Sequence, residues 1–263
     1  MKKAVNSAEK TPLVPILVGK SKLARHLSHY FDLLDAKKIG FKYQHFDNAR
    51  DLQNPDLYQK IREVNTVWIL TNDQSIETVY SKIKIEMMNA DLNSDHYTFI
   101  HSSAASNIPG MQTIHPLMTF ADNFYNFEQY QDIPFAVIAE EAESLSHRLP
   151  FPNPHFVISP EHQALYHAYA VLMSNIPILL WSITSQAAQE KLSLDPHLFD
   201  PILKQSVENF IQNQGNALTG PIARKDHATI EKNLTALGNT PLSGIYKTFL
   251  SALNKEITDD YRS

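Results

Sequence analysis

The first half of the chain alternates short apolar runs with segments whose apolar residues recur every three or four positions. Helical spacing of this kind covers Leu23, Leu27 and Leu34, and we expect a second helix over 51–64. The short runs are typical of buried strands and cover 13–18, 41–46, 66–70, 97–101 and 135–139. Strands that alternate with helices predict a Rossmann-type α/β domain with a mostly parallel sheet and helices on both faces.

The pattern changes after the proline-dense stretch PFPNP at 150–154, and helices follow one another from there. Helix starts are indicated at Ser159-Pro160, Asp200-Pro201, Asp226 and Thr240-Pro241, with closing glycines at 215 and 238. We therefore predict an α/β domain over 12–152 and an all-α domain over 153–263.

The nearly uncharged segment 168–184 raises the question of a membrane span. It is short for one, and Ser174, Asn175 and Pro177 interrupt it. We interpret it as a core helix of the second domain, buried on most sides, and expect no membrane association.

Composition narrows the classes of function. The 263 residues are 43% hydrophobic and 19% charged, which is enough apolar side chain for real cores. A net charge of −5 gives no cationic footprint for nucleic acid. The absence of cysteine excludes disulfides, thiolate metal sites and a cysteine nucleophile. Residues 1–12 contain no apolar signal segment, so we expect a cytoplasmic protein. We also expect these residues to fray. The twelve histidines show no metal-binding spacing, so no metal is predicted.

Ligands of parallel α/β sheets bind beyond the carboxyl ends of the strands, which points here to 19–24, 71–73 and 101–103. The first turn reads Gly19-Lys20-Ser21-Lys22-Leu23-Ala24, so Gly19 and Ala24 satisfy two of the three small positions of a dinucleotide-binding turn. Ser21 places a side chain where phosphate should pass. The amides of the helix N-terminus form an anion site to which Lys20 or Lys22 adds charge. An ordinary strand-to-helix turn explains the same six residues equally well.

The end of the second expected strand carries opposing signals for the type of dinucleotide. Asp47 would bond a ribose 2′-hydroxyl and favour NAD, whereas Arg50 would pair with a 2′-phosphate and favour NADP. Asp47-Asn48 is also explained as a simple turn and helix cap.

Further polar residues follow strand ends or lie on the long apolar helix. Thr71, Asn72 and Asp73 follow one strand, and His101, Ser102 and Ser103 end another, while His115 lies in a nearby loop, 113–116. Histidine and serine there can orient a carbonyl or hydroxyl substrate. His167 and Asn175 share a side of the helix, since each four-residue step drifts by about 40°. His167 can serve as acid/base, or it is a hydrogen-bonded core or interface histidine.

Several phrases together resemble a known family. They are TNDQSI at 71–76, HSSAAS at 101–106, HPLMTF at 115–120, YHAYAVLMSN at 166–175 and ALTGPIARKDHATI at 217–230. The chain is similar to Rossmann-like oxidoreductases of uncharacterised activity whose C-terminal half is a domain of unknown function, akin to the helical domain of phosphogluconate dehydrogenase. It departs from that family at Ser21, Ala104 and Lys225, where glycine is frequent.

The resemblance implies an NADP-linked dehydrogenase or reductase, with substrate between the domains and a homodimer formed through the helical half. It also implies that His167, Asn175, Thr219 and Arg224 face the cleft. His167 stands where related hydroxyacid dehydrogenases have lysine.

The sequence therefore predicts an NAD(P)-dependent oxidoreductase that acts on a small anionic carbonyl or hydroxy compound, with NADP expected and NAD possible. The alternative is a non-catalytic dinucleotide sensor or dimeric interaction protein. The expected cofactor-binding residues are Gly19, Lys20, Ser21, Lys22, Leu23, Asp47, Asn48, Arg50, Thr71, Asn72, Asp73, His101 and Ser102. The expected substrate-binding residues are Ser103, His115, Thr219 and Arg224, and the expected catalytic residues are His167 and Asn175.

Overall fold

The computed structural model describes residues 14–39, 41–140 and 152–259, and side chains as far as residue 253. The chain divides into two compact units, Met1–Ser174 and Asn175–Ser263. The expected fraying of residues 1–12 and the start of the proline-dense stretch lie outside the described residues.

The first unit contains a seven-stranded sheet in the order β2-β1-β3-β4-β5-β6-β7. Strands β1 to β5 are parallel, β6 runs antiparallel to β5, and β7 is parallel to β6. The strands are β1 Pro15–Val18, β2 Gln44–Phe46, β3 Thr66–Ile69, β4 Thr98–His101, β5 Gln112–Pro116, β6 Phe135–Ile138 and β7 His155–Ile158. The predicted Rossmann-type, mostly parallel sheet is confirmed.

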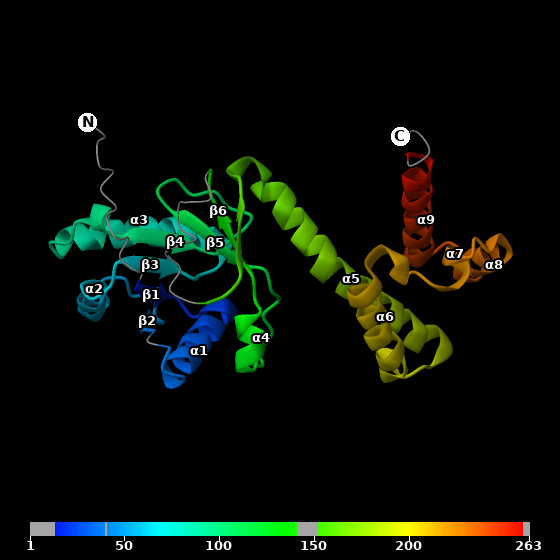
Figure 1. Ribbon diagram of the computed structural model, residues 1–263, viewed down its shortest axis with the longest axis horizontal. Coiled ribbons are helices and arrows are strands. Elements are labelled where there is room, and N and C mark those ends of the chain that lie inside the picture. The colour runs from blue at the N-terminus through cyan, green and yellow to red at the C-terminus, as the bar shows by residue number, and fades with distance from the viewer. Residues whose placement is uncertain (1–13, 40, 141–151, 260–263) are drawn as a thin grey trace, which may run out of the picture. The chain divides into compact units, whose positions relative to one another are not determined.

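The central strands are apolar on both faces because helices cover both sides of the sheet (Figure 1). Leu17 and Trp68 pack with helix α1, Lys22–Ala36, and helix α4, Phe127–Gln131. The alternate residues Ile16 and Val67 pack with the other pair of helices. Those are α2, Pro55–Ile61, and α3, Asp73–Asn89.

Asn153, just before the edge strand β7, forms hydrogen bonds to helices α1 and α4. Its side chain is 4% exposed; its Oδ1 accepts a hydrogen bond from the Tyr30 hydroxyl at 2.6 Å, and its Nδ2 donates to the carbonyl oxygens of Tyr130 and Ile133 at 2.6 and 2.9 Å. The sheet thus extends past residue 152, where we expected the first domain to end.

Two strands and one helix differ from the sequence-based expectations. Thr113–Pro116, expected as a loop, belongs to β5, and the segment expected only to lead into helices contains β7. Histidine and proline weaken the apolar pattern of both. Helix α2 begins later than expected because Asn54 caps it, accepting from the amide of Asp56 at 3.0 Å.

The later helices begin at the signals read from the sequence. Asp226 caps α8 by accepting from the amide of Thr229 at 3.0 Å, and Thr240 Oγ1 accepts from the amide of Ser243 at 3.3 Å. The helices are α5 Gln163–Leu192, α6 Asp200–Asn213, α7 Gly220–Ala223, α8 His227–Leu237 and α9 Pro241–Asp259. Turns of 3₁₀ helix cover Ser94–His96, Pro160–His162, Pro196–Phe199 and Gln214–Ala217.

Helix α5 corrects one expectation. It runs unbroken through Pro177 for 30 residues, and its exposure differs from what was predicted. It is not buried on most sides in the single chain: Met173, Ile178 and Leu179 are 66%, 52% and 57% exposed. With its preceding turn, Pro160–Leu192, it is long and apolar enough to cross a membrane by length and composition, and none of its most apolar window is buried.

Candidate functional site

The chain reverses its direction of travel across the sheet between β1 and β3, since β2 lies on one side of β1 and β3 on the other. Such a switch point opens a crevice at the carboxyl ends of the strands. Gly19 leaves β1 there with φ +130°, and a Cβ at this position would lie 2.5 Å from the carbonyl oxygen of Leu70. Only glycine fits this turn.

Ser21, which replaces the second glycine of the expected turn, caps helix α1. Its Oγ accepts a hydrogen bond from the amide of Ala24 at 3.2 Å, and its carbonyl oxygen accepts from the amide of Arg25 at 3.0 Å. The first amides of a helix have no intrahelical acceptor. Among the described residues the amides of Lys22 and Leu23 therefore remain for an anion.

A cavity of about 300 Å³ lies at this crevice. Its walls come from the helix α1 N-terminus, the ends of β3 and β4, the start of α3 and the chain after β5. The lining residues are Ser21, Lys22, Leu23, Ile69, Leu70, Thr71, Asp73, Ile76, Ser102, Ser103 and Phe120. The hydroxyl of Ser102 is buried and has no hydrogen-bond partner among the described residues. A buried hydroxyl without a partner is unfavourable, so it fits a polar ligand in this cavity.

His101 is fully buried behind the cavity wall. Its Nδ1 accepts from the amide of Ser103 at 3.3 Å, so Nε2 carries the proton and donates to Thr113 Oγ1 at 3.0 Å. Burial lowers the pKa of His101 to about 4, partly offset by the carboxylate of Asp73. The neutral ring fixes the loop that presents Ser102 and Ser103, and its direct contact with a cofactor stays a prediction.

A second cavity, of about 560 Å³, lies between the loop after β2 and helix α3. Arg50 and Lys82 are the basic residues of its lining, and neither forms an ion pair or hydrogen bond within the described chain. The acidic residues of the lining, Asp51 and Glu86, accept hydrogen bonds from neighbouring amide side chains. Asp47 is exposed and does not line this cavity.

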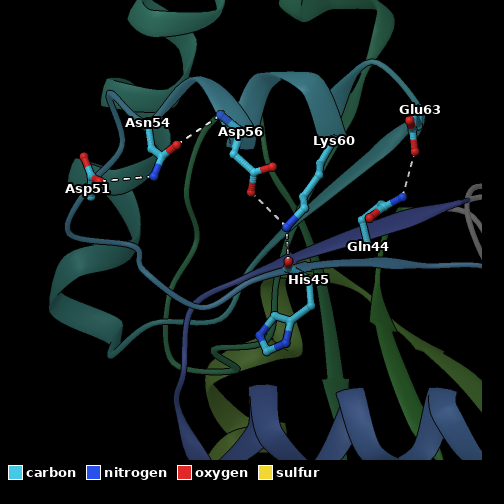
Figure 2. Close-up of polar contacts among 7 residues, drawn as sticks. All are labelled: Gln44, His45, Asp51, Asn54, Asp56, Lys60 and Glu63. Carbon is cyan, nitrogen blue, oxygen red and sulfur yellow. Dashed lines mark hydrogen bonds and ion pairs between the residues drawn. The ribbon is translucent and has the colours of Figure 1, made fainter.

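The nearby cation Lys60 is occupied within the protein, as Figure 2 shows. Its Nζ lies 2.9 Å from Asp56 Oδ2 and donates to the carbonyl oxygen of His45 at 3.2 Å. Gln44 donates to Glu63 at 2.8 Å beside it. These contacts fasten α2 to β2, so Lys60 supports the strand and leaves Arg50 and Lys82 as available cations.

His115 lies on β5 beyond the carboxyl end of β4, because Thr113 is already the partner of His101, the last residue of β4. Its Nδ1 shares a hydrogen bond of 2.8 Å with the hydroxyl of Tyr166, and its ring centroid is 6.5 Å from that of His167. Burial lowers the pKa of His115 to about 4, with a smaller contribution from His167, and burial raises the pKa of Tyr166 to about 12. His115 and Tyr166 are thus both neutral near pH 7.

The structure brings together much of the expected site. Six expected cofactor residues and Ser103 line the smaller cavity, and Arg50 lines the larger. Lys20, Asn48 and Asn72 are exposed and line neither. Asn175, Thr219 and Arg224 belong to the second unit, so their place in the site stays a prediction.

The sequence analysis missed Phe120 and Lys82, and it gave no role to Tyr166, the first residue of the phrase at 166–175. The phrase HPLMTF includes Phe120, but nothing in it indicates that this aromatic ring reaches the crevice. Lys82 lies two turns into α3, and only the fold places it opposite Arg50.

Lys225 and Ala104, at two positions where the resembling family frequently has glycine, differ in backbone conformation. Lys225 has φ +54°, a left-handed conformation that favours glycine. Ala104 has no such conformation and is buried, so alanine is accommodated.

The strand order, the glycine turn and the crevice define a Rossmann-type α/β protein. Residues 138–252 match the model of a domain of unknown function, DUF2520. This match confirms the resemblance noted for the C-terminal half.

Two solved structures have a similar fold. One, from Bacteroides fragilis, is provisionally described as an NADP oxidoreductase; it is 17% identical, with a TM-score of 0.66 over 93% of this chain and 98% of that chain. The other, a Thermotoga maritima protein described without an activity, is 21% identical, with a TM-score of 0.67 over 95% of this chain and 100% of that chain. No curated protein matches closely enough to count as a relative.

Proposed function

We propose that the protein is an NADP-dependent oxidoreductase that acts on a small anionic carbonyl or hydroxy compound. The observation that carries this proposal is the cavity at the switch point. It combines the helix α1 N-terminus with the buried hydroxyl of Ser102, which has no hydrogen-bond partner in the part of the chain that the structure describes. A diphosphate suits the helix N-terminus, and a ribose or carboxamide group suits the hydroxyl.

The two cavities suit the two ends of a dinucleotide. Consecutive residues at the start of α3, Asp73 and Gln74, line the smaller and the larger cavity respectively. The larger cavity offers Arg50 and Lys82 to a phosphate at its end of the ligand. The choice of NADP over NAD is supported by these two cations and by the position of Asp47 outside the lining.

The proposed chemistry uses the groups on β5 and α5. The bound cofactor would supply or accept the hydride, and the protein must handle the accompanying proton. His167 is the proposed acid/base. The neutral pair of His115 and Tyr166 beside it offers an N–H or O–H donor that can hold a substrate oxygen. Arg224 and Thr219 of the second unit are proposed to bind the anionic part of the substrate.

Titration of the purified full-length protein with NADPH, followed by calorimetry and by NADPH fluorescence, tests the proposal. We expect saturable binding that weakens in Ser102→Val, which removes the hydroxyl from the cavity lining, and is unchanged in the matched variant Ser94→Val, at a partly buried position that lines neither cavity. Absence of binding at millimolar NADPH overturns the proposal. Binding that persists in His167→Ala without any turnover in either variant or wild type would favour the dinucleotide sensor instead.

We also propose that the helical unit pairs with a second copy of the chain. Among its described residues only Ile230 and Ser243 are buried, while large apolar side chains such as Leu179, Ile202 and Phe210 are 57%, 63% and 41% exposed. A helical domain needs a buried apolar face to be stable. A second copy would supply that face at once to both chains.

Sedimentation analysis without detergent tests this pairing. The expected species is a dimer that dissociates in Leu179→Glu and persists in Met88→Glu, a matched change at an exposed residue of α3. A monomeric wild-type protein contradicts the proposal, and so does a protein that needs detergent to leave the membrane fraction.

A further inference from the structure

The segment 117–125, between β5 and α4, is held against helix α1 by the buried residue His26. The ring of His26 is 1% exposed; its Nε2 donates to the carbonyl oxygen of Ala121 at 3.0 Å, and its Nδ1 accepts from the hydroxyl of Tyr130 at 2.7 Å. Its centroid lies 5.0 Å from that of Phe120 and 4.9 Å from that of Tyr125. One histidine on α1 thus fixes the backbone and two rings of the segment.

The outer side of the segment is fixed by a separate residue, Phe124. Its ring stacks on His29 at 4.3 Å between centroids, and the guanidinium of Arg25 lies 5.5 Å from its centre. Phe124 is 45% exposed and does not line the cavity. It therefore contributes to the position of the segment without reaching the crevice.

One other residue of the segment lines the cavity, and another pairs with a lysine that does. Phe120 lines the cavity opposite the strand ends, together with Ser21 and Ser102. Asp122 Oδ1 lies 3.1 Å from the Nζ of Lys22, a lysine that itself lines the cavity. Lys22 is the cation nearest in sequence to the free amides of α1, so an anion at those amides and the carboxylate of Asp122 attract the same ammonium group.

We propose that the segment 117–125 is the outer wall of the dinucleotide site, in which Phe120 contacts the bound dinucleotide and Asp122 competes with its phosphates for Lys22. This inference rests on the proposed function. It assigns opposite effects on dinucleotide affinity to two residues. Phe120 raises the affinity through apolar contact, and Asp122 lowers it because it weakens the anion site.

Binding of two probes to the full-length protein by calorimetry tests the inference. The probes are NADPH and inorganic pyrophosphate, which lacks any ring. Asp122→Asn should raise the affinity for both by about two- to fivefold, the range expected for release of one exposed ion pair. Phe120→Ala should lower the affinity for NADPH by about three- to tenfold and leave that for pyrophosphate unchanged.

Each variant has a matched control. Asp132→Asn removes the same charge from an exposed position away from the cavity lining, and Phe124→Ala removes an aromatic ring of the same segment that does not reach the cavity. Asp132→Asn should leave the affinity for both probes unchanged. Phe124→Ala loosens the segment without removing a contact at the cavity, so it should lower the affinity for NADPH less than Phe120→Ala does. If Phe120→Ala fails to fold, Phe120→Leu provides the same comparison with most of the volume retained.

The outcomes separate this inference from the proposed function. Wild-type protein that binds NADPH, with the Asp122 and Phe120 variants indistinguishable from their controls, overturns the inference alone. Wild-type protein that does not bind NADPH overturns the proposed function, while a tighter pyrophosphate complex of Asp122→Asn still supports the competition for Lys22. If the wild type does not bind NADPH and Asp122→Asn does not bind pyrophosphate more tightly, both the proposed function and this inference are overturned.

Discussion

The Nε2 of His45 on β2 donates a hydrogen bond to the carbonyl oxygen of Gly19 at 3.0 Å, and its Nδ1 lies 3.4 Å from the hydroxyl of Ser28 on α1. The second strand thus holds both the glycine turn and the helix that follows it. Gly19 in turn donates its amide to the carbonyl oxygen of Phe46 at 2.9 Å. The turn expected to carry phosphate is fixed from a neighbouring strand.

Replacing His45 with alanine should loosen this turn. We expect a loss of about 1 kcal/mol in the free energy of unfolding, from one hydrogen bond, and weaker NADPH binding. Urea unfolding and fluorescence titration measure the two effects. His45→Gln, which retains a side-chain donor, should recover part of both; equal behaviour of the two variants would contradict this role.

Arg50 and Lys82 should determine discrimination between NADPH and NADH. Arg50→Ala should weaken NADPH binding by about tenfold or more, the range of a charge-assisted hydrogen bond, and leave NADH unchanged. Lys82→Ala should have a smaller effect in the same direction. Lys60→Ala is the matched control, because Lys60 is already paired with Asp56, and its ratio of NADPH to NADH affinity should remain that of the wild type.

Acid should destabilise the first unit through His101. Its pKa is lowered by burial to about 4, below the unfolded value of about 6.5, so the neutral form is favoured by folding. The stabilisation is complete above about pH 6.5 and is lost as pH falls towards about 4, by roughly 3 kcal/mol at most.

Urea unfolding between about pH 7.5 and pH 4.5 measures this loss. The slope of stability against pH should be smaller in His101→Gln than in the wild type. His96→Gln, at an exposed position, should keep the wild-type slope. An unchanged slope in His101→Gln would show that other groups carry the acid sensitivity.

Glycine at position 225 should stabilise the helical unit. Lys225 has φ +54°, and the left-handed conformation is unfavourable for any residue with a Cβ. After the extra chain entropy of glycine is subtracted, Lys225→Gly should gain about 0.5–1 kcal/mol. Lys232→Gly, inside α8, should instead lose about 1 kcal/mol. Thermal unfolding should therefore move in opposite directions in these two variants.

Local patterns predicted the central strands and the helix caps because each is determined by nearby residues. Thr66–Ile69 is apolar throughout, and Asp226 bonds an amide three residues away. Strand β5 was missed because His115 and Pro116 interrupt its apolar pattern, and its pairing partners lie on β4 and β6. The exposure of Leu179 was missed because an apolar helix has the same sequence pattern whether its own chain or another covers it.

The candidate site was predictable where the backbone itself forms it. Gly19 and the residues after β3 and β4 were found from strand ends alone. Phe120 and Lys82 reach the cavities from a loop and from the third turn of a helix, so their positions depend on packing between distant segments. His26, which fixes the loop, looks like any other polar residue of α1 in the sequence, yet it is 1% exposed.

The placement of Asn153 has a practical consequence for dissecting the protein. A polypeptide cut at residue 152 would contain the glycine turn but would lack the side-chain amide of Asn153. The hydroxyl of Tyr30 and the backbone carbonyl groups of Tyr130, Gln131 and Ile133 would then lose a hydrogen-bond partner. It would also lack an edge strand, together with Tyr166 and His167. The smallest fragment worth expressing for nucleotide titrations therefore extends to about Ser174, where the first compact unit ends.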